Sequence, residues 1–182
     1  KKLIEQGLAK IEKSVMDNIE VQNDRVAVYE ALKHLIVSGN VLLHLTDTGL
    51  RVYRLENYVV KRDPQGHVMK IIIKESVVSD TLPPKIQKAI GGEYDNQQEK
   101  TCDLYTCVKR MGKKFMVHQE VKGHVLYTKE YTDETLPFIA LRFNRVDGMN
   151  YGRGHVESFI GDLKSLEGLT RAILEGSSAS AK

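Results

Sequence analysis

The sequence has no tryptophan and only two cysteines, Cys102 and Cys107. The two thiols lie five positions apart in one predicted strand, where their side chains point to opposite faces, so we expect no disulfide between them. Two isolated thiols are typical of a reducing compartment and exclude a small secreted domain framed by disulfides. We therefore expect synthesis in a cytosol.

Long apolar runs are also missing. No stretch reaches the roughly 20 apolar residues that span a bilayer, and no signal peptide is recognisable, so we expect no membrane partner. The net charge of +3 comes from 27 basic and 24 acidic residues. This balance is a mixed surface and lacks the clustered basic bias of strong sequence-specific DNA-binding proteins.

The 182 residues, of which 41% are apolar, can build one ordinary domain or one domain with an appendage. The chain starts with Lys1 rather than Met and ends in a short serine- and alanine-rich stretch after a helical pattern. From these two features we expect an internal fragment of a longer polypeptide.

Helical periodicity marks the first 38 residues. Residues 2–21 repeat apolar side chains at three- and four-residue steps, which predicts an amphipathic helix. A second helix is expected from Arg25 to about Ser38, with Asp24 as its N-cap and Gly39 at its end. Its predicted buried face comprises Val28, Tyr29, Leu32, Leu35 and Ile36. We expect the two helices to form an antiparallel hairpin.

From Asn40 the apolar period changes to two, which indicates strands. Strand patterns cover residues 41–45, 50–55, 58–62, 67–76, 101–109, 115–121, 125–131 and 138–145. A short helix is predicted over 84–90, and the polar stretch 93–100 is predicted to be a mobile loop. The fold class is therefore α+β: an N-terminal helical hairpin, an antiparallel or mixed β-rich body of six to seven strands, and a long C-terminal helix.

No catalytic motif is recognisable in the sequence. There is no G-x-S-x-G sequence, and neither cysteine has a histidine nearby in the sequence. His118 and His124 flank a predicted turn and are a weak candidate metal pair, for which a structural role is the better expectation. We predict no catalytic, cofactor-binding or metal-ligating residue, no cofactor, no small-molecule substrate and no enzymatic activity.

Two stretches could attract phosphate. Gly148, Gly152 and Gly154 precede a helix N-terminus, where backbone N–H groups favour anions, and Arg153 lies among them. Because the Walker and G-x-G-x-x-G patterns are absent, a tight turn is the preferred interpretation. The alternative is a small ligand-binding or hydrolytic α+β domain with an anion site at Gly148–Gly154.

The second stretch is a predicted hairpin tip with four basic residues: Lys109, Arg110, Lys113 and Lys114. A solvated turn is favoured there over phosphate contact, because no interleaved aromatic residues accompany the charges. Neighbouring carboxylates, such as Asp133 with Glu134 and Glu157 with Asp162, are equally well explained as surface charge.

The helix after Gly154 allows two interpretations. Its apolar side chains follow three/four spacing over about five turns: Val156, Phe159, Ile160, Leu163, Leu166, Leu169 (or Thr170) and Ile173. It is either a core helix that closes the domain or a helix that contacts another subunit. Gly161 and Gly168 weaken it but would let another helix approach closely.

Several blocks together resemble one protein family, in order from about Val15 to Leu174. They are Glu30–Lys33 with Gly39–Leu43, Tyr53–Asp63 with Gly66, Asp147–Gly148, Tyr151–Gly154, and Gly161–Glu167. In these blocks the sequence is similar to the head-to-tail connector, or portal, proteins of short-tailed double-stranded DNA bacteriophages and prophages. The likeness weakens between Val77 and Glu134.

The resemblance implies a structural role. Portal proteins form a ring, typically dodecameric, at one capsid vertex of the virion after assembly in the bacterial cytoplasm. Double-stranded DNA enters and leaves through the channel, and the ring docks the terminase, which supplies the ATPase, and later the tail. The resemblance also implies a division into a wing-like domain over 1–146, a glycine turn and the start of a stem-like helix over 147–175, and a tail at the truncation point over 176–182.

Overall fold

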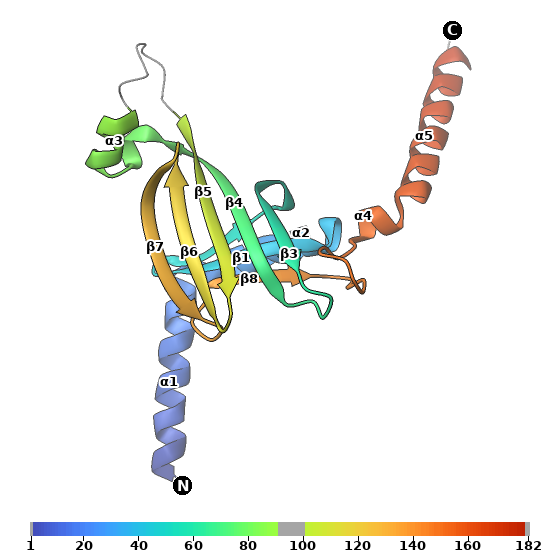
Figure 1. The fold of residues 1–182 in the computed structure, drawn as a ribbon. Coiled ribbons are helices and arrows are strands. Elements are labelled where there is room, and N and C mark those ends of the chain that lie inside the picture. The colour runs from blue at the N-terminus through green and yellow to red at the C-terminus, as the bar shows by residue number, and fades with distance from the viewer. Residues whose placement is uncertain (1, 91–100, 181–182) are drawn as a thin grey trace.

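The computed structural model describes residues 2–90 and 101–180, and the predicted mobile loop at 93–100 lies outside them. Two helices, α1 (Lys2–Val21) and α2 (Asp24–Ser38), precede a β-rich body, and two more, α4 (His155–Ser158) and α5 (Ile160–Ser180), follow it (Figure 1). A short helix, α3 (Pro84–Ile90), interrupts the body as predicted. The α+β class is confirmed.

The described residues form eight strands, one at each of the eight strand patterns although six to seven were expected in the body, and they divide into two sheets. Their bounds are β1 (Asn40–Thr46), β2 (Gly49–Tyr53), β3 (Tyr58–Arg62), β4 (Val68–Val78), β5 (Thr101–Met111), β6 (Lys114–Val121), β7 (His124–Thr132) and β8 (Phe138–Arg142). One sheet has the order β2-β1-β8 and the other β3-β4-β5-β6-β7, and every pairing is antiparallel.

The main core lies between the two sheets. Leu42 from the small sheet and Ile71, Ile73 and Val108 from the large sheet are fully buried in one cluster. In β4 burial alternates along the strand, so each second side chain faces the core and its neighbours face outward. A smaller hydrophobic cluster, formed by Leu82, Cys102 and Val121, lies next to α3.

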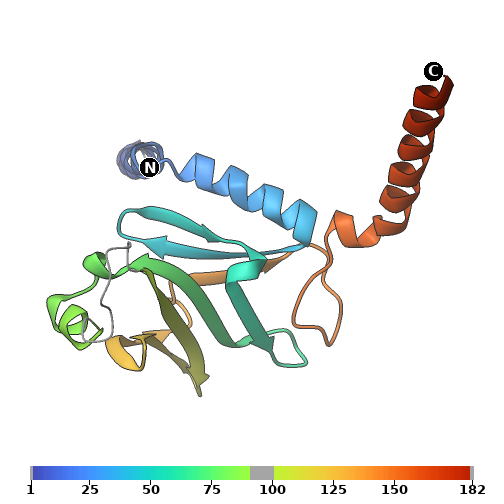
Figure 2. The same ribbon diagram turned by 90° about the horizontal axis from the view of Figure 1, so that it is seen from above.

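Helix α2 lies over the three-stranded sheet, with the five-stranded sheet on the other side (Figure 2). Ala31 is its only buried residue. Most of the face predicted to be buried is in fact exposed: Val28, Tyr29, Leu32 and Ile36. The prediction was wrong because α2 carries apolar side chains on nearly all sides, so periodicity could not identify the side that meets the sheet.

The link between α1 and α2 also differs from expectation. Asn23 takes the N-cap position in a left-handed conformation with φ 55°, without a side-chain hydrogen bond. Asp24 is already helical, and its Oδ1 accepts a hydrogen bond from the Leu50 N–H at 2.8 Å instead. Helix α1 is seen end-on in Figure 2 while α2 is seen from the side, so the two helices are not an antiparallel packed hairpin.

The C-terminal helix is broken near its start. α4 ends at Ser158, because the next residue, Phe159, leaves the helical region with φ −116° and ψ 17°, and α5 then runs from Ile160 to Ser180. It therefore continues past residue 175, the expected end of the stem-like stretch, into residues 176–180 of the expected tail. No described side chain of α5 is buried. The core-helix interpretation is wrong.

None of the helices within residues 2–90 and 101–180 combines the length and hydropathy needed to cross a bilayer.

Candidate functional site

The segment that leads into α4 is fastened to the point where α2 ends and β1 begins. Asn40 is buried, with 3% of its surface exposed. Its Nδ2 donates to the Gly152 carbonyl at 2.7 Å, and its Oδ1 accepts from the Gly152 N–H at 2.8 Å. One side-chain amide therefore satisfies both backbone groups of a residue 112 positions away in the sequence.

Glycine is required at this junction because two backbones touch. Gly39 has φ 76° and ends α2 by donating its N–H to Leu35 O at 2.9 Å. A Cβ on Gly39 would lie 2.3 Å from the backbone of Arg153 and Gly154, and a Cβ on Gly154 would lie 2.2 Å from Val37 O. These distances exclude any larger residue without backbone movement.

The same contacts distinguish between a structural turn and an anion site at the Gly148–Gly154 stretch. Only Gly148 has the positive φ, 73°, of a turn glycine. The Gly152 N–H is bonded to Asn40, the Arg153 N–H donates to Asn144 O at 2.9 Å, and the Arg153 side chain meets Glu157 at 3.3 Å. These N–H groups are committed to the protein itself, so the geometry favours a structural turn over an anion site.

From this junction α4 and α5 project away from the body, and α1 projects from another part of it (Figure 1). The apolar stripe of α5 is exposed along its whole length: Ile160, Leu163, Leu166, Leu169, Ile173 and Leu174. The stripe of α1 is exposed in the same way: Ile4, Leu8, Ile11, Val15 and Met16. Monomeric proteins rarely expose contiguous apolar surface of this extent, which marks both helices as contact surfaces.

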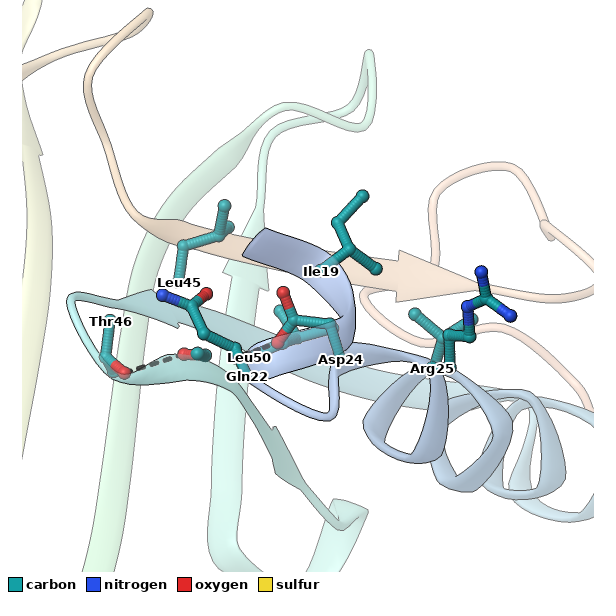
Figure 3. A pocket seen from close by; sticks show the side chains of 9 residues that line it. Ile19, Gln22, Asp24, Arg25, Leu45, Thr46 and Leu50 are labelled. Atoms are coloured by element: carbon teal, nitrogen blue, oxygen red, sulfur yellow. Dashed lines mark hydrogen bonds between the residues drawn. The ribbon is translucent and has the colours of Figure 1, made fainter. Parts of the chain in front are cut away.

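An apolar groove continues the α1 stripe at the α1–α2 link (Figure 3). It has a volume of about 440 Å³ and is lined by Ile19, Val28, Leu45 and Leu50 among others. At this groove, the Asp24 carboxylate accepts the hydrogen bond from Leu50 described above, which connects the α1–α2 link to β2. This hydrogen bond joins the α1–α2 side of the groove to the small sheet.

The other residues singled out in the sequence have local partners. His118 contacts Thr128 Oγ1 at 3.1 Å and Glu120 at 3.6 Å, and not His124. Cys102 and Cys107 are free thiols, as predicted. At the basic hairpin tip, Arg110 pairs with Asp133 and Lys114 with Glu130, both at 2.9 Å. That tip is partly neutralised, in agreement with the solvated-turn interpretation.

Sequence reasoning missed a cluster of three arginines: Arg62, Arg142 and Arg145. They gather around the tip of the β3–β4 hairpin, where Arg62 Nη1 donates to the Gly66 carbonyl at 2.9 Å and Arg145 Nη2 to the Gln65 carbonyl at 3.0 Å. Because Arg62 is about 80 positions from the other two, no local pattern could have signalled the cluster.

A family model described as "Bacteriophage head to tail connecting protein" matches residues 1–182. The portal proteins of Escherichia phage T7 and Enterobacteria phage T3 are each 35% identical over 98% of this chain, and that of Enterobacteria phage SP6 is 32% identical over 92%. The chain spans about a third of the length of these relatives, namely 35%, 35% and 34%.

Proposed function

The chain belongs to the family of bacteriophage head to tail connecting proteins, and we propose that it is the structural part of a portal subunit that assembles into a ring. The observation that carries this proposal is the match of the family model to all 182 residues. The relatives at 31–35% identity are portal proteins of four phages, so the match is consistent across them.

The exposed apolar helices supply the kind of surface that a ring needs. A closed ring with head-to-tail contacts requires two different patches on each subunit, facing opposite neighbours. Helix α1 with the groove at its end and helix α5 leave the body in different directions (Figure 1). We assign the first patch to α1 and the groove, and the second to α4 and α5.

The domain division follows the same logic. Residues 1–146 form the wing-like part of the subunit, and 147–175 form the glycine turn and the first section of a stem-like helix that lines the channel. The fastening of Gly152 to Asn40 supports this division, because it fixes the direction in which the helix leaves the body. Of the stretch 176–182, expected as a tail, residues 176–180 belong to α5.

The ring has a structural role and catalyses no reaction of its own. Its family is structural, which fits a protein without a catalytic centre. It sits at one capsid vertex of the virion after assembly in the host cytoplasm, and it takes capsid, terminase and tail proteins as partners. Double-stranded DNA passes through its channel during packaging and ejection.

The test is electron microscopy of the purified protein together with its copy number in virions. We expect ring particles with a central channel and about a dozen copies in each virion, as closed cyclic symmetry demands a fixed subunit number. A protein present in hundreds of copies in each virion, or absent from virions, would contradict the proposal.

A further inference from the structure

Three guanidinium groups surround a single glycine at the tip of the β3–β4 hairpin. The position that a Cβ on Gly66 would occupy lies 2.9 Å from Arg142 Nη2 and 3.2 Å from Arg145 Nη2. Arg62 donates to the carbonyl oxygen of the same glycine at 2.9 Å. The three cations are therefore close neighbours, although they come from the end of β3, the end of β8 and the loop after it.

Backbone carbonyls hold the three side chains in place. In addition to the bond to Gly66, Arg62 donates from Nη2 to Ala140 O at 2.9 Å and from Nε to Asn150 O at 3.1 Å. Arg142 Nη1 donates to Met149 O at 2.9 Å, and Arg145 Nη2 donates to Gln65 O at 3.0 Å. These bonds fix the guanidinium planes, but neutral carbonyls do not balance the charge.

Carboxylates are scarce around the cluster. Within the described part of the chain, neither Arg62 nor Arg142 forms an ion pair, and Arg145 meets only Asp147, at 3.6 Å. The Asp147 side chain is 96% exposed, so this contact is strongly screened by water. Burial lowers the pKa of Arg62, and the charges of Arg142 and Arg145 lower it further.

We propose that the arginine cluster of Arg62, Arg142 and Arg145 binds a phosphate group, carried either by a nucleic-acid backbone or by a small phosphate compound. Planar guanidinium forks match phosphate oxygens geometrically, and the anion relieves the repulsion among the three cations. Each guanidinium has five N–H donors, and Arg142 and Arg145 each spend one on the hydrogen bonds described above. The Arg145 side chain is 54% exposed, so a ligand can reach it.

This site is separate from the ring. The cluster lies at a hairpin tip, whereas the proposed subunit contacts lie on α1, α4 and α5. A wild-type protein that forms rings but binds no phosphate would refute the phosphate site alone, and a wild-type protein that binds phosphate but forms no rings would refute the ring alone.

The test measures binding of a short fluorescent DNA duplex by anisotropy over a series of salt concentrations. The double variant Arg142→Gln/Arg145→Gln should bind about tenfold more weakly near 0.1 M salt, and its salt dependence should fall by about one unit of slope, since one phosphate contact is lost. The matched control Lys109→Gln/Lys113→Gln removes the same charge from the basic hairpin tip and should bind like the wild type. Arg142→Lys/Arg145→Lys keeps the charge without the forks and should fall between the two.

Inorganic phosphate, titrated while the amide spectrum around Gly66 is followed by NMR, distinguishes the source of the phosphate. Phosphate binding that depends on Arg142 and Arg145, without duplex binding, supports the site and identifies its ligand as a small phosphate compound. Three results would overturn the proposal: no binding of either probe to the wild type, equal weakening in both glutamine double variants, or competition by polyglutamate that matches competition by phosphate.

Discussion

Asn40 joins the two ends of the β-rich body through one amide. Because both its oxygen and its nitrogen bond to Gly152 in a buried position, no other side chain of similar size reproduces the pair. Aspartate would keep the acceptor and lose the donor. These two hydrogen bonds of a single residue therefore fix the direction in which α4 leaves the body.

We expect Asn40→Ala to lower the free energy of unfolding by about 2–4 kcal/mol, because it leaves the buried N–H and C=O of Gly152 without partners. Urea denaturation measures the change. Asn57→Ala is the matched control, since Asn57 is exposed, and it should stay within about 0.5 kcal/mol of the wild type. An Asn40→Ala protein as stable as the control would show that the amide does not hold the junction.

His44 predicts a pH dependence of stability. Its ring stacks on Phe138 with centroids 4.1 Å apart, and its Nδ1 is buried without a hydrogen-bond partner. Burial, and then the charge of Arg51, lower the pKa of His44 below its usual 6.5, although Glu75 opposes them. The unfolded chain therefore binds a proton at a higher pH than the folded protein does.

The stability that neutral His44 contributes is thus complete above pH 6.5 and is lost as the pH falls from 6.5 through the lowered pKa. Urea denaturation at pH 7.5, 6.5 and 5.5 should show falling stability in the wild type and a flatter profile in His44→Phe. If both proteins lose the same stability over this range, His44 is not the responsible group.

At the scale of elements, the glycine before α4 and the glycines within α5 have different surroundings. Gly154 touches the end of α2, and a Cβ there would lie 2.2 Å from Val37 O. A Cβ on Gly161 or Gly168 in α5 would meet nothing within 4 Å. The first glycine is needed by this fold, whereas the other two leave room for another helix.

The substitution Gly154→Ala should therefore destabilise the protein by more than about 2 kcal/mol, since backbone must move to admit the methyl group. Gly161→Ala should instead raise the helix content and stabilise α5 by up to about 1 kcal/mol. Circular dichroism with thermal unfolding compares the two variants. Equal effects of both substitutions would contradict the distinction between a packed glycine and an open one.

Helices and strands were predictable where the local pattern of apolar and turn residues alone specifies them. The bounds of α1, the short helix α3 and the strand patterns follow from apolar period and turn residues such as Pro64 and Gly66. The buried face of α2 was not predictable, because Ala31 meets the sheet while larger apolar side chains remain exposed. The break at Phe159 was not predictable either, because the apolar spacing continues through it without interruption.

At the scale of the whole molecule, the missing information is what covers α1 and α5. Periodicity correctly gave each an apolar stripe, but a stripe has the same pattern whether it faces its own core or another subunit. The arginine cluster was beyond prediction for a related reason, since Arg62 and Arg142 meet only in the folded chain. The resemblance to the head-to-tail connector family is confirmed by the match over residues 1–182, and it is the basis for proposing that other subunits cover the two stripes.

The most direct test of the ring is the particle mass of the whole protein that contains these 182 residues, measured by mass photometry. We predict a dodecameric ring for the wild type and dissociated subunits for Leu163→Asp/Leu166→Asp, because charge on an apolar interface opposes its burial. Both side chains are exposed in the single chain, so the dissociated variant should still be folded, with the circular dichroism spectrum of the wild type. A wild-type protein that remains a single subunit at high concentration would contradict the account.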